Sequence, residues 1–291
     1  MIGVEKFVNS SLLAGDQLFN YLDFTLLILS TILIAAAGNI INDYFDLKAD
    51  KVNKPDKLIL TKHIKKRWAI FSHWIFNGIA ILLVGYLSWK YKNLWLFVLP
   101  FISINILWYY STTLKRKLII GNVSIAILTA LVIILSYIFL SETFIIDEQK
   151  RYFIGYISIF AFVQNFAREI IKDAQDIDGD KLINVNSLPM KLGMQKSLVL
   201  VSIILSVLPL LIGFQLACSS NIYTLSISKY FPIICAGLIN CALILLIYFK
   251  RGDSLILYDR LIKISMIFGI SSLYYLPLIY EKNSSWFSIA P

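Results

Sequence analysis

Charged residues, cysteine and histidine are all scarce in this sequence. Only 15% of the 291 residues are charged, whereas a typical soluble domain is about one quarter charged. The three cysteines, Cys218, Cys235 and Cys241, lie in or beside apolar runs and have no CxxC spacing. We interpret them as small apolar fillers. With only two histidines, the chain gives no support to a zinc site or a Cys/His nucleophile. The composition also excludes a disordered chain, a collagen and a coiled coil.

Apolar residues are abundant instead. They make up 58% of the chain, and the mean hydropathy is +0.73. A membrane-crossing helix needs about 20 mostly apolar residues, and the sequence has eight stretches of this kind. We therefore predict an all-α, polytopic membrane helix bundle. The predicted spans are 23–42, 69–89, 93–110, 119–140, 152–171, 197–217, 229–249 and 262–281.

The basic residues indicate how the bundle is oriented. The net charge is +9, from 27 Lys and Arg against 18 Asp and Glu. Most of the basic residues fall in alternate connections, namely those after 23–42, 93–110, 152–171 and 229–249. Cytoplasmic loops of membrane proteins carry such an excess. We expect a multi-pass protein of the cytoplasmic membrane with these connections in the cytoplasm.

Two acidic clusters lie on the same predicted side, each after the end of a predicted span. In both, three aspartates have the spacing i, i+3, i+7, which on a helix brings them to one face. The first cluster is Asp43, Asp46 and Asp50, and the second is Asp173, Asp176 and Asp180.

Carboxylates so placed repel each other, and they also oppose the negative end of the helix dipole. A divalent cation reverses the sign of both effects. Mg²⁺ prefers carboxylate oxygens and usually takes one or two of them together with substrate phosphates. We therefore predict two half-sites that hold Mg²⁺ on a diphosphate, with all six aspartates as candidate metal ligands. The alternative is a pair of solvated polar loops.

The connection after 93–110 supplies basic and aromatic residues on the same side. Lys115 or Arg116 is placed to neutralise diphosphate oxygens, and Tyr110 to donate a hydrogen bond. The alternative is an ordinary juxtamembrane belt of basic and aromatic residues. Arg168 and Lys172, which flank the second cluster, either share this role or pair with neighbouring carboxylates.

These motifs resemble those of the UbiA-type intramembrane prenyltransferases. The match comprises the segment from Asn42 through the first cluster to Asn53 and Pro55, the second cluster, and Tyr110-Ser111 with Leu114-Lys115. Further details resemble the branch that makes archaeal-type ether lipids. These details are residues 35–38, the pair Gly121-Asn122, residues 168–173 and the segment Ser187-Leu188-Pro189.

The resemblance implies Mg²⁺-dependent transfer of a geranylgeranyl group from an allylic diphosphate to geranylgeranylglyceryl phosphate. The alternative acceptor is an aromatic compound, such as a quinone precursor. The catalytic residues implied are Asp43, Asp46, Tyr110, Lys115, Asp173 and Asp176. The substrate-binding residues implied are Asn42, Asn53, Lys115, Arg116, Asn122, Arg168 and Lys172.

The chain also departs from the family pattern. The family typically has nine membrane helices, so the eight predicted here suggest that the first is missing. We expect residues 1–22 to be a tail, a remnant of that helix, and 23–291 to form the transmembrane domain. Its pseudo-repeat halves are predicted at 23–140 and 152–281.

The expected partners are a prenyl diphosphate, a lipophilic acceptor and membrane lipid, and nothing in the charge pattern suggests nucleic acid. A membrane transporter is the alternative from another class. Transporters usually carry their acidic residues near the bilayer midplane, whereas these carboxylates lie at helix ends. The pattern therefore favours an enzyme with its active site at the cytoplasmic end.

Overall fold

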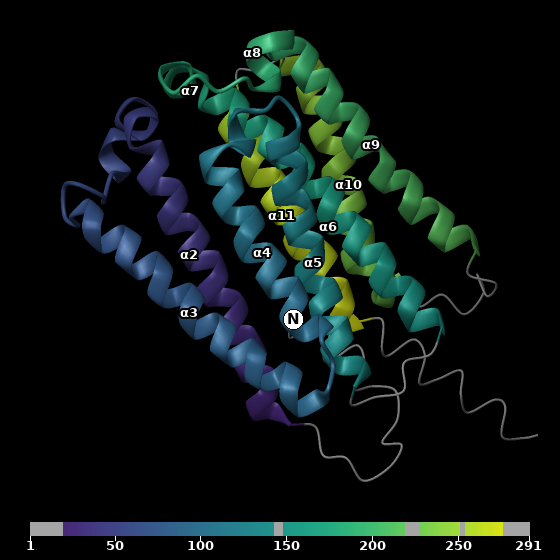
Figure 1. Ribbon diagram of the computed structural model, residues 1–291. Coiled ribbons are helices and arrows are strands. Elements are labelled where there is room, and N and C mark those ends of the chain that lie inside the picture. The colour runs from purple at the N-terminus through teal and green to yellow at the C-terminus, as the bar shows by residue number, and fades with distance from the viewer. Residues whose placement is uncertain (1–19, 143–147, 219–226, 251–253, 276–291) are drawn as a thin grey trace, which may run out of the picture.

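The computed structural model describes residues 20–142, 148–218, 227–250 and 254–275, and their regular structure is helical (Figure 1). This confirms the predicted all-α class. The helices are α2 (Tyr21–Asn53), η1 (Pro55–Lys57), α3 (Lys66–Tyr91), α4 (Trp95–Thr112), η2 (Leu114–Arg116), α5 (Ile120–Ser141), α6 (Glu148–Gln175), α7 (Ile177–Leu182), α8 (Leu188–Leu192), α9 (Met194–Cys218), α10 (Ile227–Lys250) and α11 (Leu255–Tyr275).

Each predicted span coincides with one long helix, but two boundaries differ substantially. Helix α2 continues past the predicted end at residue 42 to Asn53. Helix α11 begins at Leu255 instead of 262, and residues 276–281 of the last predicted span lie outside the described residues. The same holds for residues 1–19 of the predicted tail. Apolar composition marks the part of a helix that suits lipid, whereas the helix itself continues into the polar region.

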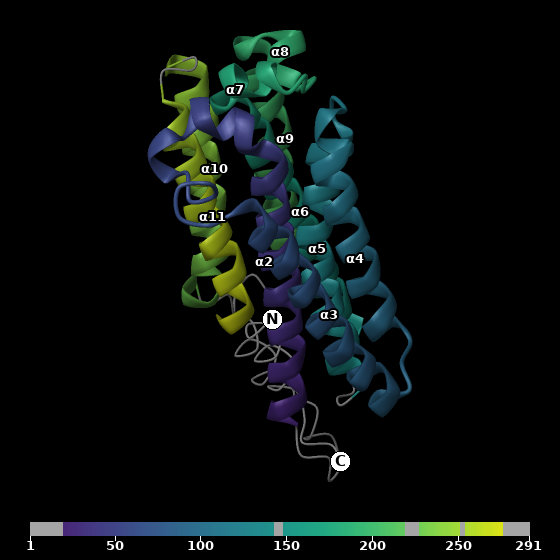
Figure 2. The ribbon, with the colours of Figure 1, turned by 60° about the vertical axis from the view of Figure 1, so that its left-hand side comes forward.

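The long helices run up and down in one bundle. Helix α2 packs on α3 and α4, α5 packs on α6, and α10 packs between α9 and α11. Figures 1 and 2 show α7 and α8 at one end of this bundle, together with the α2–α3 and α4–α5 connections. One apolar core lies among α2 to α6, around Leu27 and Phe139. A second lies among α6, α9, α10 and α11, around Leu205 and Tyr258.

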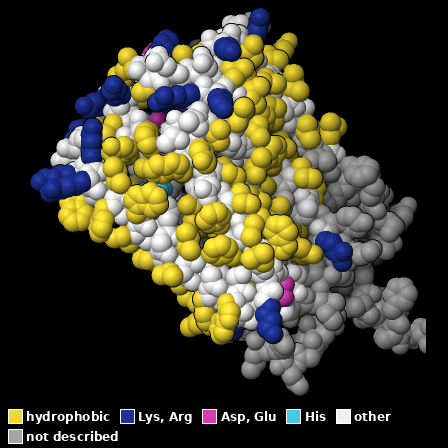
Figure 3. Space-filling view, viewed as in Figure 1, with side chains coloured by type: hydrophobic (Ala, Val, Ile, Leu, Met, Phe, Trp, Pro, Cys, Tyr) yellow, Lys and Arg dark blue, Asp and Glu magenta, His cyan; other side chains and the backbone are white. Residues whose placement is uncertain are grey.

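The face of the bundle seen in Figure 3 is apolar along its middle. Large hydrophobic side chains such as Leu82, Trp89 and Leu210 are more than 70% exposed, which suits a surface that faces lipid tails. Among the described residues, five helices are long and apolar enough to cross a membrane by length and composition. They are α2, α3, α4, α5 and the segment Pro232–Phe249 of α10. Lys and Arg side chains gather at the end that carries α7 and α8.

Buried polar contacts fix the position of α6 in this apolar environment. The Gln164 side-chain amide donates to Asn240 Oδ1 of α10 (3.1 Å) and to Ser265 Oγ of α11 (2.6 Å). On the other side, Asn165 donates to Thr129 Oγ1 of α5 (2.6 Å). Interhelical hydrogen bonds of this type stabilise helix packing where no water competes. They set the height and rotation of α6, whose last turn carries Asp173 of the second acidic cluster.

Small residues permit the closest helix contacts. At Gly269 of α11, an added Cβ would lie 2.1 Å from a ring carbon of Phe160 on α6, and the Phe160 side chain is buried. At Gly78 of α3, an added Cβ would meet nothing within 4 Å. The α6–α11 contact therefore depends on glycine, whereas the exposed α3 position does not.

We predict that Gly269→Ala destabilises the protein by about 1–3 kcal/mol, because the buried Phe160 ring must move. Gly78→Ala is the matched control, with an expected unchanged or slightly higher stability because alanine favours the helix. Thermal unfolding of both variants in detergent measures this. Equal unfolding temperatures for the two variants would contradict the close contact.

Candidate active site

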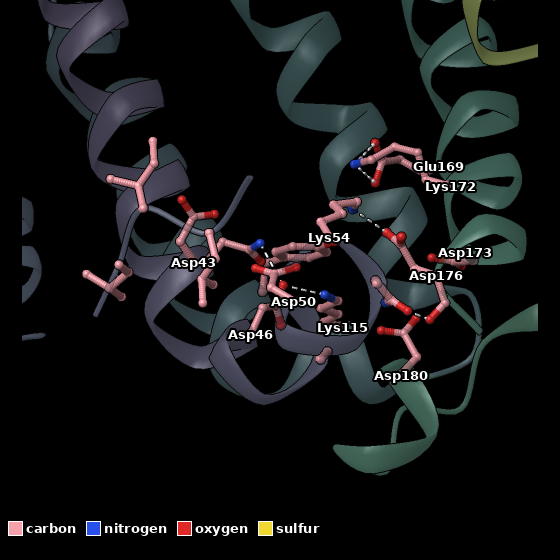
Figure 4. Close-up of a pocket in the computed structure, with 17 residues that line it drawn as sticks. Asp43, Asp46, Asp50, Lys54, Lys115, Glu169, Lys172, Asp173, Asp176 and Asp180 are labelled. Carbon is pink, nitrogen blue, oxygen red and sulfur yellow. Dashed lines mark hydrogen bonds and ion pairs between the residues drawn. The ribbon is translucent and has the colours of Figure 1, made fainter. Parts of the chain in front are cut away.

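A cavity of about 240 Å³ opens at the end of the bundle that carries α7 and α8 (Figure 4). Its walls come from α2, α4, η2, α6 and α7, together with residues 58–60 after η1. Typical drug-sized ligands occupy pockets of about 300–1,000 Å³, so this cavity suits a charged headgroup better than a long chain. Its lining residues are Asn42, Asp43, Asp46, Ala49, Asp50, Asn53, Lys54, Leu58, Ile59, Leu60, Tyr110, Lys115, Glu169, Lys172, Asp173, Asp176 and Asp180.

The first acidic cluster lies on one face of α2, as its spacing predicts. Asp46 is the buried member, and its Oδ2 accepts hydrogen bonds from Asn42 Nδ2 (2.8 Å) and Lys115 Nζ (2.5 Å). Asp43 is exposed and Asp50 half-buried. The prediction that this cluster follows the end of its helix is wrong, because α2 continues to Asn53.

The second cluster is not carried by one continuous helix, which corrects the expectation from its spacing. Helix α6 ends at Gln175, and Asp176 is the N-cap residue of the short helix α7, with φ −100° and ψ 8°. Asp173 is therefore in the last turn of α6, and the buried Asp180 is in α7. A contact with α2 explains this break, since Asn53 Nδ2 donates to the Asp176 carbonyl oxygen (3.0 Å).

Each lysine that lines the cavity forms an ion pair with a carboxylate. Lys54 pairs with Asp176 (2.8 Å), Lys115 with Asp46, and Lys172 with Glu169 (3.0 Å). All three pairs are drawn in Figure 4, and the first two join the side of one cluster to the other elements that line the cavity. These ammonium groups therefore partly neutralise the carboxylates, and they are within reach of an anion that enters the cavity.

The two arginines predicted for substrate binding do not line the cavity. Arg168 donates through Nε to Asp259 of α11 (2.9 Å), and its guanidinium also lies 3.5 Å from a Glu169 oxygen. Arg116 is exposed. The sequence offers no signal for the Arg168–Asp259 pair, because its partners are far apart in the chain.

Asn122 contributes indirectly, from the start of α5. It does not line the cavity, but its Nδ2 donates to Asp173 Oδ2 (2.8 Å). Lys54, Glu169 and residues 58–60 also line the cavity, although they are not among the predicted site residues. The charged side chains next to the two clusters were a usable signal, whereas the apolar Leu58, Ile59 and Leu60 gave none.

The cavity has more negative than positive charge. Seven carboxylates line it against three lysines. Burial raises the pKa of Asp180 to about 6, and the neighbouring Asp176 and Asp46 act in the same direction against Lys115. Burial alone would lower the pKa of the Lys115 ammonium, but the Asp46 carboxylate outweighs it and the pKa is raised. Lys115 is therefore cationic at neutral pH, whereas the pKa of Asp180 is about 6.

The chemistry of the donor set fits a hard divalent cation. Two oxygens, Asn42 Oδ1 and Asp180 Oδ1, are buried and accept no hydrogen bond. Within the described ranges, no group of three or more His, Cys, Asp or Glu side chains is arranged to hold a metal ion by itself. Mg²⁺ matches this arrangement, since it usually takes only one or two carboxylates and completes its shell with substrate phosphates and water.

The fold and the cavity together define a membrane helix bundle with two opposed acidic clusters at one end. A model of the UbiA prenyltransferase family matches residues 7–257. The chain therefore belongs to the UbiA prenyltransferase family and is an integral membrane protein.

Curated relatives agree with this assignment. The digeranylgeranylglyceryl phosphate synthase of Pyrococcus horikoshii is 34% identical over 187 residues, which are 62% of this chain and 63% of that protein. The protein of the same name from Thermococcus sibiricus is 33% identical over 215 residues, or 72% of this chain and 68% of that protein. The match to the Pyrococcus horikoshii relative thus spans less than two thirds of its length.

Two solved structures have the same fold. A UbiA homologue from Aeropyrum pernix K1, in its apo form, superimposes with a TM-score of 0.68 at 15% identity and covers 96% of both chains. A structure described as giving insights into digeranylgeranylglyceryl phosphate synthase in membranes has a TM-score of 0.66 at 22% identity. It covers 94% of this chain and 91% of that chain. At these identities the likeness supports the fold alone.

The raised pKa of Asp180 predicts a pH-dependent stability in the absence of divalent cations. A carboxyl whose pKa is about 6 in the folded protein, against an ordinary value of 3.8, binds its proton more tightly when folded. Its ionisation therefore destabilises the protein above pH 6, by at most about 3 kcal/mol, and this cost disappears as the pH falls toward 4.

Asp180→Asn removes this ionisable group with little change in shape. We expect the variant to gain thermal stability over the wild type at pH 7.5 with a chelator present, and to gain less at pH 5. A stability difference that is independent of pH would show that Asp180 has an ordinary pKa.

Proposed function

We propose that this protein catalyses the Mg²⁺-dependent transfer of a geranylgeranyl group from its allylic diphosphate to geranylgeranylglyceryl phosphate. The observation that carries the proposal is the convergence of two acidic clusters and three lysines on one cavity in a UbiA-family chain. The acceptor follows from the curated relatives, which are named digeranylgeranylglyceryl phosphate synthase. Such a reaction belongs to the synthesis of ether-type lipids.

The charge of the cavity supports the metal. A diphosphate is itself an anion, and seven carboxylates against three lysines would repel it. Bound Mg²⁺ supplies the positive charge that holds the diphosphate and stabilises it as a leaving group. On this proposal the six aspartates of the two clusters are the metal ligands, and Asn42 Oδ1 is a further oxygen donor beside the first cluster.

The lysines have a complementary task. Lys115 and Lys54, which pair with Asp46 and Asp176, would be available to contact diphosphate oxygens if those carboxylates were also bound to Mg²⁺. Lys172 reaches the same cavity from α6. Tyr110 lines the cavity from α4, where its hydroxyl is placed to donate a hydrogen bond to the leaving group.

The reaction itself breaks the bond between the prenyl C1 and the diphosphate oxygen, which leaves with the electron pair. The acceptor hydroxyl oxygen then attacks C1 and gives its proton to the departing diphosphate or to solvent. The prenyl chain needs an apolar channel, and the cavity lies at the end of a bundle whose outer surface is apolar. The membrane therefore delivers both lipophilic substrates to the site.

The orientation is part of the same proposal. The cavity shares its end of the bundle with the lysine-rich α2–α3 and α4–α5 connections, which have exposed Lys62, Lys65, Arg116 and Lys117. An excess of basic residues marks the cytoplasmic side. We place the active site at the cytoplasmic face of the membrane, where charged prenyl diphosphates have access from water.

Aspartate-to-asparagine variants of the two clusters test the proposal. Asp46→Asn and Asp173→Asn should each lower the transfer rate at least about a hundredfold, because even groups that only orient metal ligands contribute about 10–100-fold. Exposed Lys48→Ala on α2 is the control and should keep the wild-type rate. The assay uses labelled geranylgeranyl diphosphate, Mg²⁺ and purified protein in lipid.

A panel of acceptors in the same assay separates the remaining readings. Product with geranylgeranylglyceryl phosphate supports the proposal. Product only with an aromatic quinone precursor would show that the acceptor is an aromatic compound instead. If the wild type forms no product with any acceptor of the panel, a transporter becomes the better interpretation. Wild-type rates from both asparagine variants would overturn the metal assignment.

Lys115 gives a second prediction. Lys115→Gln removes the cation but keeps a hydrogen-bond donor, so we expect the KM for the prenyl diphosphate to rise about tenfold or more, a charge-assisted contact being worth about 1.5–3 kcal/mol. Lys117→Gln, at an exposed position outside the cavity, is the matched control. Steady-state kinetics at saturating Mg²⁺ measure both values, and an unchanged KM in Lys115→Gln would exclude contact with the diphosphate.

A further inference from the structure

The Asn53 side chain, at the end of the helix that carries the first half-site, forms hydrogen bonds to the backbone of the second half-site. Its Nδ2 donates to the Asp176 carbonyl oxygen (3.0 Å), and its Oδ1 accepts from the Gly179 backbone N–H (2.8 Å). Both ends of the side-chain amide are therefore engaged by the segment that carries the second acidic cluster. The resemblance had implied that Asn53 binds substrate.

Gly179 lies directly against this amide. A Cβ at that position would lie 2.3 Å from Asn53 Nδ2 and 2.6 Å from the Ala49 carbonyl oxygen of α2. The second contact is with backbone, which cannot rotate away as a side chain can. Only glycine therefore allows α7 to approach α2 this closely.

The position of this contact gives it consequences for the cavity. Asn53 is the last residue of α2, in the turn after Asp50, and the segment it holds runs from Asp176 to Asp180. Asp176 marks the break between α6 and α7, so its side chain is placed by the local backbone. Lys54, the next residue, adds an ion pair to Asp176, but its side chain is 43% exposed, against 20% for the Asp176 side chain.

We infer that Asn53 and Gly179 are positioning residues that fix the distance between the two acidic half-sites. Asn53 holds the backbone of Asp176 and Gly179, and Gly179 lets α7 close onto α2. Without this contact the two clusters would still be present, but Asp176 and Asp180 would no longer be held opposite Asp46 and Asp50. The catalytic consequence of this inference rests on the proposed function, whereas its structural part stands without it.

Amide hydrogen exchange of the full-length protein tests the structural part. In Asn53→Ala, the Gly179 N–H loses its acceptor, so exchange in residues 177–182 should accelerate about tenfold or more relative to the wild type. Exposed Lys51→Ala on α2 is the matched control and should leave this segment unchanged. Equal exchange in Asn53→Ala and the wild type would overturn the inference whether or not the chain transfers prenyl groups.

The Mg²⁺ dependence of transfer tests the catalytic part. Asn53→Ala loses two hydrogen bonds, which correspond to a change of about 10–30-fold in an equilibrium constant. We expect the Mg²⁺ concentration needed for half-maximal rate to rise by that factor. Saturating Mg²⁺ should restore most of kcat, whereas a general loss of folded protein would lower kcat at every Mg²⁺ concentration.

Gly179→Ala provides an independent variant, because it keeps every hydrogen-bonding group and changes only the closeness of α7 and α2. It should raise the required Mg²⁺ concentration in the same direction as Asn53→Ala. A wild-type Mg²⁺ dependence in both variants would contradict the positioning role. No transfer by the wild type would instead contradict the proposed function, and the exchange experiment would still decide the structural part.

Discussion

The excess of carboxylates over lysines in one cavity is the constraint on which the rest of this structure depends. Seven acidic side chains converge there against three lysines, and each lysine is already paired. Such an arrangement opposes folding unless cations occupy it, so it is unfavourable as a structural device. It becomes favourable once divalent cations and an anionic diphosphate enter together. The apolar bundle then supplies the second requirement, a site that lipophilic substrates reach from the membrane.

The scaffold supports this cavity by holding two helices in fixed register. Helix α6 is held by Gln164 and Asn165, which bond to α10, α11 and α5 at depths where water does not compete. Asn122 then orients Asp173 at the end of α6, and Asn53 ties the following segment to α2. These side-chain amides are neutral, so they position the carboxylates without adding to the repulsion between them.

Much of this arrangement was predictable from sequence, and the failures have physical reasons. The long helices of the described residues and the grouping of both clusters follow from hydropathy and from the i, i+3, i+7 spacing, which are local properties. The break at Asp176 was not predictable, because it lies at the contact of Asn53 and Gly179 between α2 and α7, which only the folded chain creates. The pairing of Arg168 with Asp259 was hidden for the same reason. Local patterns identify which residues carry charge, and tertiary contacts decide which of them face the cavity.

On this interpretation of the site, the cavity binds a diphosphate only together with divalent cations. Calorimetric titration of the purified protein with a non-reactive geranylgeranyl diphosphate analogue tests this directly, with either Mg²⁺ or a chelator in the buffer. We expect saturable binding with Mg²⁺ and at least about a hundredfold weaker binding with the chelator, since two or more ion–phosphate contacts are lost. Equal affinity in the two buffers would contradict it, because the three lysines alone would then hold the diphosphate.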